Sequence, residues 1–270
     1  GDLKAMYIMG EDPVLTDANS RHVVKALRNL DFLVVQNLFL TETAKLAHVV
    51  LPGASFAEKD GTFTNTERRI QRVRKAIEPI GDSRADSWII QELARRLGYA
   101  MDYEHPRNIM EEAAALTPSY AGVTYERLES RGLQWPVLDK HHPGTPFLHS
   151  GGKFSGGTGR FMTTVFQPPA ELPDAEYPLL LTTGRTLYHY NVSTQPYSQR
   201  LSSYRPAERT MIHPDDAAGL GIADGDSILV ESRRGRVEAT AWVTDTVQPG
   251  IVWMSFHYPL SPTNELTNDA

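Results

Sequence analysis

Apolar and polar residues along the first 52 positions fall into blocks that predict buried strands and amphipathic helices. Residues 4–9 (KAMYIM), 32–36 (FLVVQ) and 48–52 (HVVLP) are short, nearly continuous apolar runs. Between the first two runs, residues 18–30 carry apolar side chains at roughly helical spacing. Continuous apolar strands separated by helices are typical of a parallel sheet that is covered on both faces.

Further helices are expected around and after the third run. Thr41 is placed to cap a short helix over residues 42–47, and Asp86 stands where the N-cap of a longer helix belongs. Shorter helices are predicted near 107–116 and 124–130. The longer helix is indicated by one repeating apolar face and by a terminal glycine, through Ile89, Ile90, Leu93, Ala94, Leu97 and Gly98.

The pattern changes after about residue 132. Prolines and the run GGKFSGGTG at 151–159 mark a connector, within which RFMTTVF at 160–166 has the composition of a strand. The remainder reads as short strands between Gly and Asp turns, with one helix that begins at Pro214. The expected strands are 178–183, 209–212, 226–232, 235–244 and 250–256, and the expected helix is 214–220.

These patterns predict two domains. Residues 1–135 would form an α/β parallel-sheet (Rossmann-like) domain, 136–176 a connector, and 177–270 an all-β barrel domain. A hydrophobic content of 40% is enough for packed cores. Both ends look cut, so we expect a piece of a longer chain.

Charge and composition exclude several classes of function. The net charge of -6 argues against nucleic-acid binding. The five cations in 68–75 fit either a solvated face or a phosphate contact. The absence of cysteine excludes disulfides, thiolate metal sites and iron–sulfur ligation on this chain. No apolar run is long enough to span a bilayer. Adjacent His141 and His142 lack a third candidate ligand, so no metal site is inferred.

Candidate ligand-binding residues follow the ends of predicted strands. Gly10-Glu11-Asp12 and Gln36-Asn37 lie at the carboxyl edge of the predicted sheet, where α/β proteins bind ligands. Thr183-Gly184-Arg185 follows a strand of the second half. There glycine would permit close backbone approach, and arginine could bind a phosphate.

Long stretches of the sequence resemble one family, the molybdopterin-dinucleotide oxidoreductases, and within it the formate dehydrogenase large subunit. In the first half these are YIMGEDPVLTDAN, VVQNLFLTETAKLAHVVLP, FAEKDGTFTNTERRIQRVRKA and ADSWIIQELARRLGY. In the second half they are LLTTGRTLYHY, HPDDAAGLGIADGDSILVESRRGRVEATAWVTD and PGIVWMSFHYP followed by NELTNDA. The resemblance runs nearly end to end, and it implies that the barrel is a six-stranded double-psi barrel.

The resemblance also implies a cofactor, a bis-molybdopterin guanine dinucleotide that carries molybdenum or tungsten. The residues that match family cofactor positions are Gly10, Glu11, Asp12, Gln36, Asn37, Lys59, Asp86, Thr183, Gly184, Arg185, His189, Tyr190, Phe256, Asn264 and Asn268. Two departures stand out: the family usually has Asp at the position of Asn37, and a different sequence at 191–195. Asp86 is equally suited to a helix N-cap.

The function implied is oxidation of formate to carbon dioxide, with electrons leaving through iron–sulfur centres. The metal ligand and the iron–sulfur cluster would lie in N-terminal domains of the same subunit, so no catalytic residue and no metal ligand is assigned here. Iron–sulfur or flavin/NAD electron-transfer subunits and a cytoplasmic location are expected. Alternatives are a nitrate reductase-like relative or a non-catalytic module that binds a pterin dinucleotide.

Overall fold

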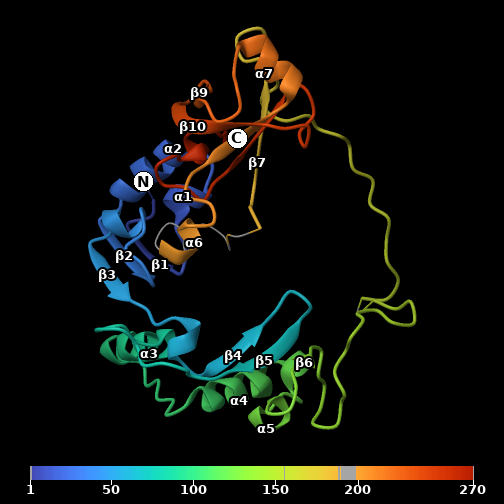
Figure 1. The fold of residues 1–270 in the computed structure, drawn as a ribbon. Helices are drawn as coiled ribbons and strands as arrows, with labels where there is room; N and C mark the ends of the chain where they lie inside the picture. Colours follow the sequence, from blue (N-terminus) through green and yellow to red (C-terminus); the bar gives the residue numbers. More distant parts are fainter. Residues whose placement is uncertain (1, 155, 188, 190–198, 270) are drawn as a thin grey trace. The chain divides into compact units, whose positions relative to one another are not determined.

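The computed structural model describes residues 2–154, 156–187, 189 and 199–269 (Figure 1). Tertiary contacts divide the chain into two compact units. The first unit combines residues 1–51 with 166–270, and the second unit comprises residues 52–165.

The boundaries of these units relate differently to the predicted domains. The boundary at 165/166 falls inside the predicted connector 136–176, whereas the boundary at 51/52 falls inside the predicted first domain. The division into domains at 1–135 and 177–270 stays a prediction, because the units group residues by spatial contact rather than by chain order.

The first unit begins with a small sheet in the order β1-β2-β3, formed by β1 (Ala5–Met9), β2 (Phe32–Asn37) and β3 (Val49–Pro52). Strands β1 and β2 are parallel, with Ile8 opposite Val35. The connection between them holds α1 (Pro13–Thr16) and α2 (Ser20–Arg28). The predicted strands and the parallel pairing are therefore confirmed.

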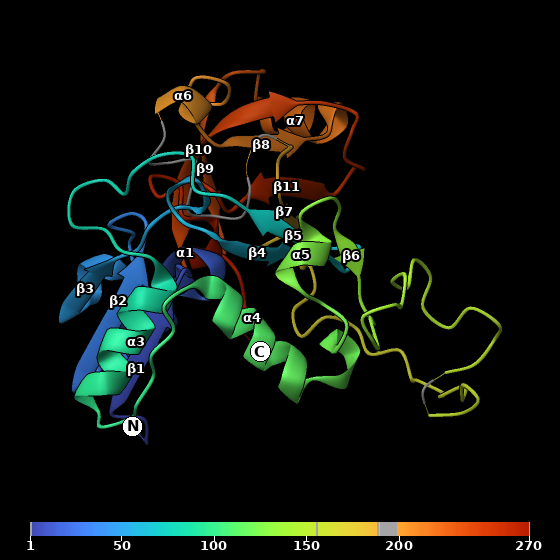
Figure 2. The same cartoon turned by 90° about the horizontal axis from the view of Figure 1, so that it is seen from below.

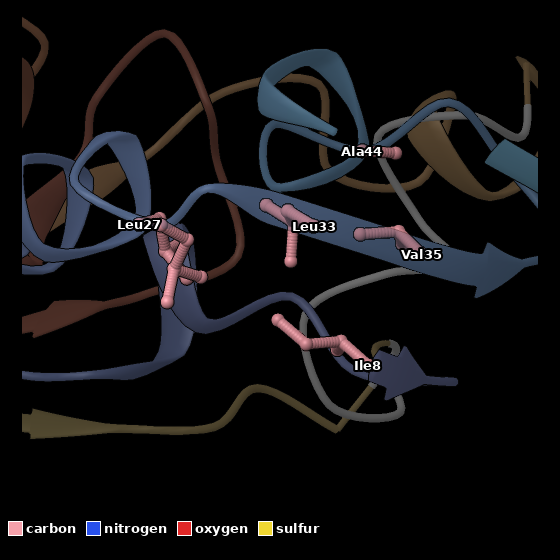
Figure 3. Packing of buried hydrophobic residues seen from close by; sticks show 6 residues of the cluster. Ile8, Leu27, Leu33, Val35 and Ala44 are labelled. Atoms are coloured by element: carbon pink, nitrogen blue, oxygen red, sulfur yellow. The ribbon is translucent and has the colours of Figure 1, made fainter. Parts of the chain in front are cut away.

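One face of this sheet carries its hydrophobic core (Figure 3). Ile8, Leu33 and Val35 point toward Leu27 of α2, and Ala44 completes the cluster. These side chains alternate along each strand with more exposed ones, as the period of a strand requires. Tyr7, Met9 and Phe32 on the alternate positions stay more than one-third exposed. Cover on the second face of the sheet stays a prediction, since Gln36 on that face is buried whereas these three side chains are partly exposed.

The segment between β2 and β3 differs from the predicted helix over 42–47. It forms only a short 3-10 turn, η1 (Ala44–Leu46), whose N-cap is Thr43. The hydroxyl of Thr41 still accepts a hydrogen bond from the Ala44 N–H at 3.1 Å. This capping contact therefore holds a short turn in place of the predicted helix.

The β-rich part of the first unit forms a mixed sheet in the order β7-β11-β8-β10-β9 among the described residues (Figure 2). Its strands are β7 (Leu180–Gly184), β8 (Arg209–Ile212), β9 (Ser227–Glu231), β10 (Arg236–Val243) and β11 (Ile251–Ser255). Parallel pairs β7/β11 and β8/β10 alternate with antiparallel pairs β8/β11 and β9/β10. Helices α6 (Gln199–Ser202) and α7 (Pro214–Leu220) flank β8 in sequence.

The predicted strands of this part are confirmed to within two residues at each end, and α7 begins at Pro214 as expected. The expected strand at 160–166 is wrong, since those residues form no strand. Phe161, Met162, Val165 and Phe166 are almost fully exposed, so composition alone did not create a strand without an edge to pair with.

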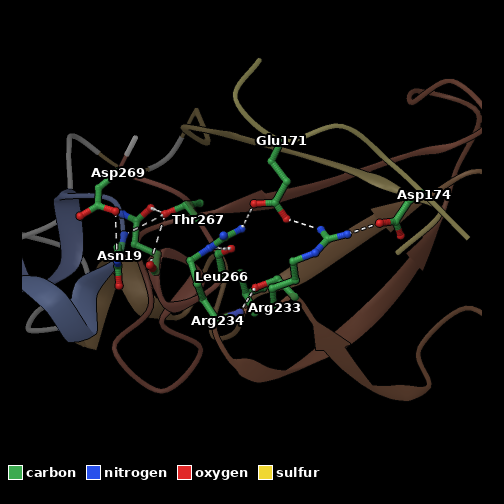
Figure 4. Close-up of polar contacts among 10 residues, drawn as sticks. Asn19, Glu171, Asp174, Arg233, Arg234, Leu266, Thr267 and Asp269 are labelled. Atoms are coloured by element: carbon green, nitrogen blue, oxygen red, sulfur yellow. Dashed lines mark hydrogen bonds and ion pairs between the residues drawn. The ribbon is translucent and has the colours of Figure 1, made fainter. Parts of the chain in front are cut away.

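The C-terminal segment after η4 (Thr263–Glu265) is tied to both parts of the first unit by polar contacts (Figure 4). Asn19, the N-cap of α2, donates to Asp269 at 3.0 Å, and the Arg234 guanidinium donates to the Leu266 carbonyl at 3.2 Å. Arg234 also pairs with Glu171 at 2.6 Å. These contacts attach the end of the described chain to α2 and to the turn between β9 and β10.

The second unit contains a small antiparallel sheet that the sequence reading missed. Strands β4 (Gly61–Thr64), β5 (Arg69–Val73) and β6 (Leu133–Gln134) pair in the order β4-β5-β6. Its remaining elements are η2 (Phe56–Glu58), α3 (Asp86–Arg96), α4 (Pro106–Leu116), η3 (Pro118–Tyr120) and α5 (Tyr125–Leu128). The core gathers around Ile70 and Leu133.

The N-cap of α3 corrects one further prediction. Ala85 occupies the N-cap position, and Asp86 is the first helical residue. An aspartate in the first turn still stabilises the helix through its dipole. Of the predicted apolar face, Ile89 is buried but Leu97 is mostly exposed. Within the part of the chain that the structure describes, no helix has the length and hydrophobicity needed to cross a membrane.

Candidate functional site

Polar residues from two loops meet at the carboxyl ends of β1 and β2. The Gly10 N–H donates to the Gln36 carbonyl at 2.9 Å, and the Asn37 side chain donates to the Glu11 carbonyl at 3.2 Å. Gly10 has φ +70, a left-handed conformation that glycine adopts without strain. The structure therefore brings together four of the predicted residues, and Gly10 and Glu11 are the exposed ones.

Asp12 is the buried anchor of this first cluster. Its side chain is 0% exposed, and Oδ1 accepts from the Thr43 N–H at 2.9 Å and from the Thr43 hydroxyl at 2.6 Å. Oδ2 is buried without a hydrogen-bond partner. Burial raises the pKa of Asp12 against the lowering effect of the Thr43 contacts. Asp12 thus ties the loop after β1 to the loop after β2.

Gln36 and Asn37 are both buried at the end of β2. The Gln36 side-chain oxygen accepts from the Tyr7 hydroxyl, and Asn37 Oδ1 accepts from the Leu38 N–H at 2.8 Å. An amide oxygen has two lone pairs, so Asn37 keeps acceptor capacity after this local bond.

A second cluster lies at the carboxyl ends of β7 and β11. In their parallel register Gly184 lies opposite Ser255, so Thr183-Gly184-Arg185 and Phe256 leave the sheet at the same edge. The Arg185 guanidinium lies 5.2 Å from the centre of the Phe256 ring, within range of a cation–π interaction. The sequence-predicted residues Gly184, Arg185 and Phe256 are thus brought together.

His189 completes this second cluster. It is 5% exposed, its Nε2 contacts the Tyr258 hydroxyl at 3.1 Å, and its ring lies 4.8 Å from that of His257. Burial, together with the charges of His257 and Arg205, lowers the pKa of His189 from 6.5 to about 4. Its Nδ1 and the nearby Thr186 hydroxyl are buried without hydrogen-bond partners. Tyr190 and residues 191–195 lie outside the described residues.

The two predicted asparagines near the C-terminus belong to η4 and to the segment that follows it. The Asn264 amide donates to the Leu15 carbonyl at 2.6 Å, which links the C-terminal segment to α1. Asn268 lines a cavity of about 870 Å³ over the mixed sheet. Arg185, His189 and Phe256 are not among the described residues that line this cavity.

Lys59 and Asp86 lie in the second unit, where they form an ion pair. Both line a cavity of about 240 Å³ whose walls include Phe63 and Met110. The hydroxyl of Tyr125 in the same wall is buried without a hydrogen-bond partner. The cavity offers the Lys59 ammonium, the carboxylates of Asp60 and Asp86, and an unsatisfied hydroxyl between apolar walls.

The arginine-rich stretch 68–75 is engaged within the second unit. Arg68 donates to the Thr145 carbonyl at 3.0 Å, and the remaining cations of the stretch pair with carboxylates. Those pairs are Arg69–Glu67, Arg72–Asp60, Arg72–Glu129, Arg74–Glu129 and Lys75–Glu78. These contacts favour a structural role over binding of phosphate.

His257, Ser255 and Glu208 were not among the predicted site residues, although the first two lie within the family-like stretch PGIVWMSFHYP. His257 accepts from the Thr186 N–H at 3.2 Å, and Ser255 donates its N–H to the buried carboxylate of Glu208 at 2.9 Å. Single His, Ser and Glu residues are common in any chain, and only folding brings these together. Among the residues that the structure describes, no three His, Asp or Glu side chains are grouped to hold a metal ion.

Two family models match the chain. The family described as "Molybdopterin oxidoreductase" matches residues 1–96, and the "Molydopterin dinucleotide binding domain" matches residues 179–270. The matches contain the loops of the first and the second cluster, respectively.

Curated relatives align with almost the whole chain. It is 47% identical over 274 residues to the F420-dependent formate dehydrogenase subunit alpha of Methanocaldococcus jannaschii, covering 100% of this chain and 41% of that protein. It is 48% identical to the F420-dependent formate dehydrogenase 2 subunit alpha of Methanococcus maripaludis, covering 99% and 40%. The chain therefore spans about two-fifths of the length of these relatives.

A solved structure has the same fold. Acetylene hydratase from Pelobacter acetylenicus superimposes with a TM-score of 0.75, covering 98% of this chain and 40% of that protein at 22% identity. At this identity the likeness shows a shared fold and carries no statement about activity.

Proposed function

Because the chain belongs to the molybdopterin oxidoreductase family, we propose that it is the C-terminal, cofactor-binding part of a formate dehydrogenase large subunit. The observation that carries this proposal is the 43–48% identity to three formate dehydrogenase alpha subunits across 99–100% of the chain. The whole subunit would oxidise formate to carbon dioxide and pass two electrons to a redox partner. An iron–sulfur cluster and the metal ligand would be supplied by other domains of that subunit.

The proposal includes the architecture of the β-rich part. We infer that β7 to β11 belong to a double-psi barrel, which the alternation of parallel and antiparallel pairs supports. Parallel neighbours without an intervening long helix are unusual in simple up-and-down barrels, which pair consecutive strands in antiparallel fashion.

The residues of the first cluster suit the nucleotide end of a pterin guanine dinucleotide. Guanine presents N–H donors, for which the exposed Glu11 carboxylate and the Asn37 amide oxygen are natural partners. Gly10 leaves backbone close to the ligand because it has no side chain. In this arrangement Asp12 holds both loops through Thr43 rather than meeting the ligand directly.

The second cluster suits an anionic and heterocyclic ligand. Buried polar atoms are rarely left unpaired in native proteins, so the Thr186 hydroxyl and His189 Nδ1 favour a ligand that supplies their missing partners. Arg185 would bind a phosphate or a pterin carbonyl, with Phe256 supporting its guanidinium. With its pKa lowered to about 4, His189 is neutral at pH 7 and can accept or donate one hydrogen bond.

In the second unit, Lys59 and Asp86 are proposed as further contacts. When bound, the metal–pterin group would supply the redox chemistry, and this chain would hold and orient it. The Lys59 ammonium can meet a phosphate or a guanine oxygen, and the Asp86 carboxylate can accept from a guanine N–H. Binding would exchange their mutual ion pair for contacts with the ligand.

The test measures cofactor retention with Arg185→Ala in the intact protein isolated with its cofactor. Loss of a charge-assisted contact worth about 1.5–3 kcal/mol predicts retention weaker by roughly 10- to 150-fold. Guanosine monophosphate released by acid hydrolysis reports bound dinucleotide per chain. Arg236→Ala is the matched control, because Arg236 on β10 forms an exposed surface ion pair with Glu231 on β9. Equal retention in both variants would remove Arg185 from the site.

A further inference from the structure

A buried carboxylate lies behind the second cluster. Glu208, directly before β8, is 2% exposed, and both of its oxygens accept from Ser255. One bond comes from the Ser255 N–H at 2.9 Å and the other from the Ser255 hydroxyl. Burial raises the pKa of Glu208, which these hydrogen bonds and the charge of Arg205 partly offset.

Ser255 connects β11 with the two strands beside it, β7 and β8. It is the last residue of β11 and lies opposite Gly184, the last residue of β7. Its carbonyl also accepts from the hydroxyl of the buried Thr263 at 2.5 Å. With its N–H, hydroxyl and carbonyl all engaged, Ser255 has little freedom to move relative to β8.

The two loops that leave this point contact each other at three successive places. The guanidinium of Arg185 stacks on Phe256, the Thr186 N–H donates to His257 Nε2, and His189 Nε2 contacts the Tyr258 hydroxyl. A shift of Ser255 would displace Phe256, His257 and Tyr258, which follow it and supply one side of each of these contacts. These contacts would then be lost together rather than singly.

We propose that Glu208 is a positioning residue that sets residues 256–258 against residues 185–189, and so pre-forms the cofactor-binding surface. This inference rests on the proposed function for what the surface binds. It makes Glu208 necessary although the side chain lies behind the loops and needs no contact with the ligand.

The chemistry of Glu208 distinguishes its variants. Glu208→Ala leaves the buried N–H and hydroxyl of Ser255 without an acceptor. Glu208→Gln can accept from the N–H through Oε1 and donate from its amide to the hydroxyl oxygen, so it should keep the geometry. Ser255→Ala removes the hydroxyl contact alone and should have an intermediate effect.

Two measurements on the intact protein test the proposal. The first is guanosine monophosphate released per chain after dialysis and acid hydrolysis. The second is the ¹⁵N signature of the His257 ring, whose Nε2 acceptor role requires the proton on Nδ1. Val237→Ala is the control for lost stability, because Val237 is buried in the core of the same sheet and lies outside the loops.

We expect Glu208→Ala to lose retention by about 10-fold or more and to lose the single-tautomer signature of His257. Glu208→Gln should stay within about 3-fold of the wild type, and Val237→Ala should retain cofactor despite a lower Tm. Retention in Glu208→Ala equal to that in Val237→Ala, with the His257 signature intact, would overturn the proposal. If Glu208→Ala does not fold, Ser255→Ala decides by the same two readouts.

Failure of the proposed function is separable from failure of this inference. A wild-type protein that releases no guanosine monophosphate would contradict the proposed function. The His257 signature would then still decide whether Glu208 positions the loops, because it needs no bound ligand.

Discussion

Gly184 should resist replacement by alanine because of one neighbouring side chain. A Cβ added at Gly184 would lie 2.7 Å from Nε1 of Trp253 and 3.2 Å from two further atoms of that indole. Carbon and nitrogen atoms do not approach so closely without a shift of the ring. Overpacking of this kind costs about 1–3 kcal/mol. Alanine also lowers the conformational entropy of the unfolded chain, which stabilises the folded state by about 0.4–1 kcal/mol. The net effect of Gly184→Ala should therefore be a destabilisation of about 1–2 kcal/mol.

A double-mutant cycle isolates this contact. In a Trp253→Ala background the obstacle is gone, so Gly184→Ala should become neutral or slightly stabilising. Urea unfolding followed by far-ultraviolet circular dichroism measures all four proteins. Gly219→Ala in α7 is the matched control, because an added Cβ there meets nothing within 4 Å and should stabilise the helix by about 0.5 kcal/mol. Additivity within about 0.5 kcal/mol between positions 184 and 253 would refute the steric explanation.

Three further variants test other contacts. His189 has a folded-state pKa of about 4, below its ordinary 6.5, so stability should be full above pH 6.5 and fall toward pH 4. The free energy of unfolding should fall by up to about 3 kcal/mol over this pH range. Chemical unfolding measured at each pH should show that His189→Gln removes this fall. Asp86→Asn should change Tm little, because the ion pair of Asp86 with Lys59 is partly exposed. The variant should release less guanosine monophosphate per chain, and an unchanged amount would contradict a contact between Asp86 and the cofactor. Gly122→Ala should cost about 3 kcal/mol or more in urea unfolding, because its Cβ would lie 1.9 Å from the Asp139 carbonyl oxygen; wild-type stability would contradict this packing.

Several elements could be predicted because their signals are local. The apolar runs at β1 and β2 specify strands through their own composition, and Pro214 marks the first turn of α7. The long motifs also predicted the family, which the matches at 1–96 and 179–270 confirm. The position of Gly10 and Gln36 at one edge of the sheet could be predicted because each follows or ends one of two parallel strands.

Other elements depended on partners far away in sequence. The β4–β5 hairpin was not predicted, because its strands are mostly polar and carry no continuous apolar run; Thr62, for example, lies opposite Arg72. Conversely, residues 160–166 have the composition of a strand but form none, because strand propensity needs an edge to pair with.

The second cluster shows most clearly where local information ends. The motif around Gly184 and Arg185 predicts a ligand-binding turn, but the contacts that support it come from Glu208 and Ser255, which lie far along the chain. Burying a carboxylate is costly unless hydrogen-bond donors lie beside it. The Ser255 N–H and hydroxyl come to lie beside Glu208 only after β11 pairs with β7 and β8. The sequence alone was therefore enough to name the family and to propose which residues bind its ligand. The contacts that hold those residues in place arise only from the tertiary structure, because long-range hydrogen bonds leave no periodic pattern in a chain.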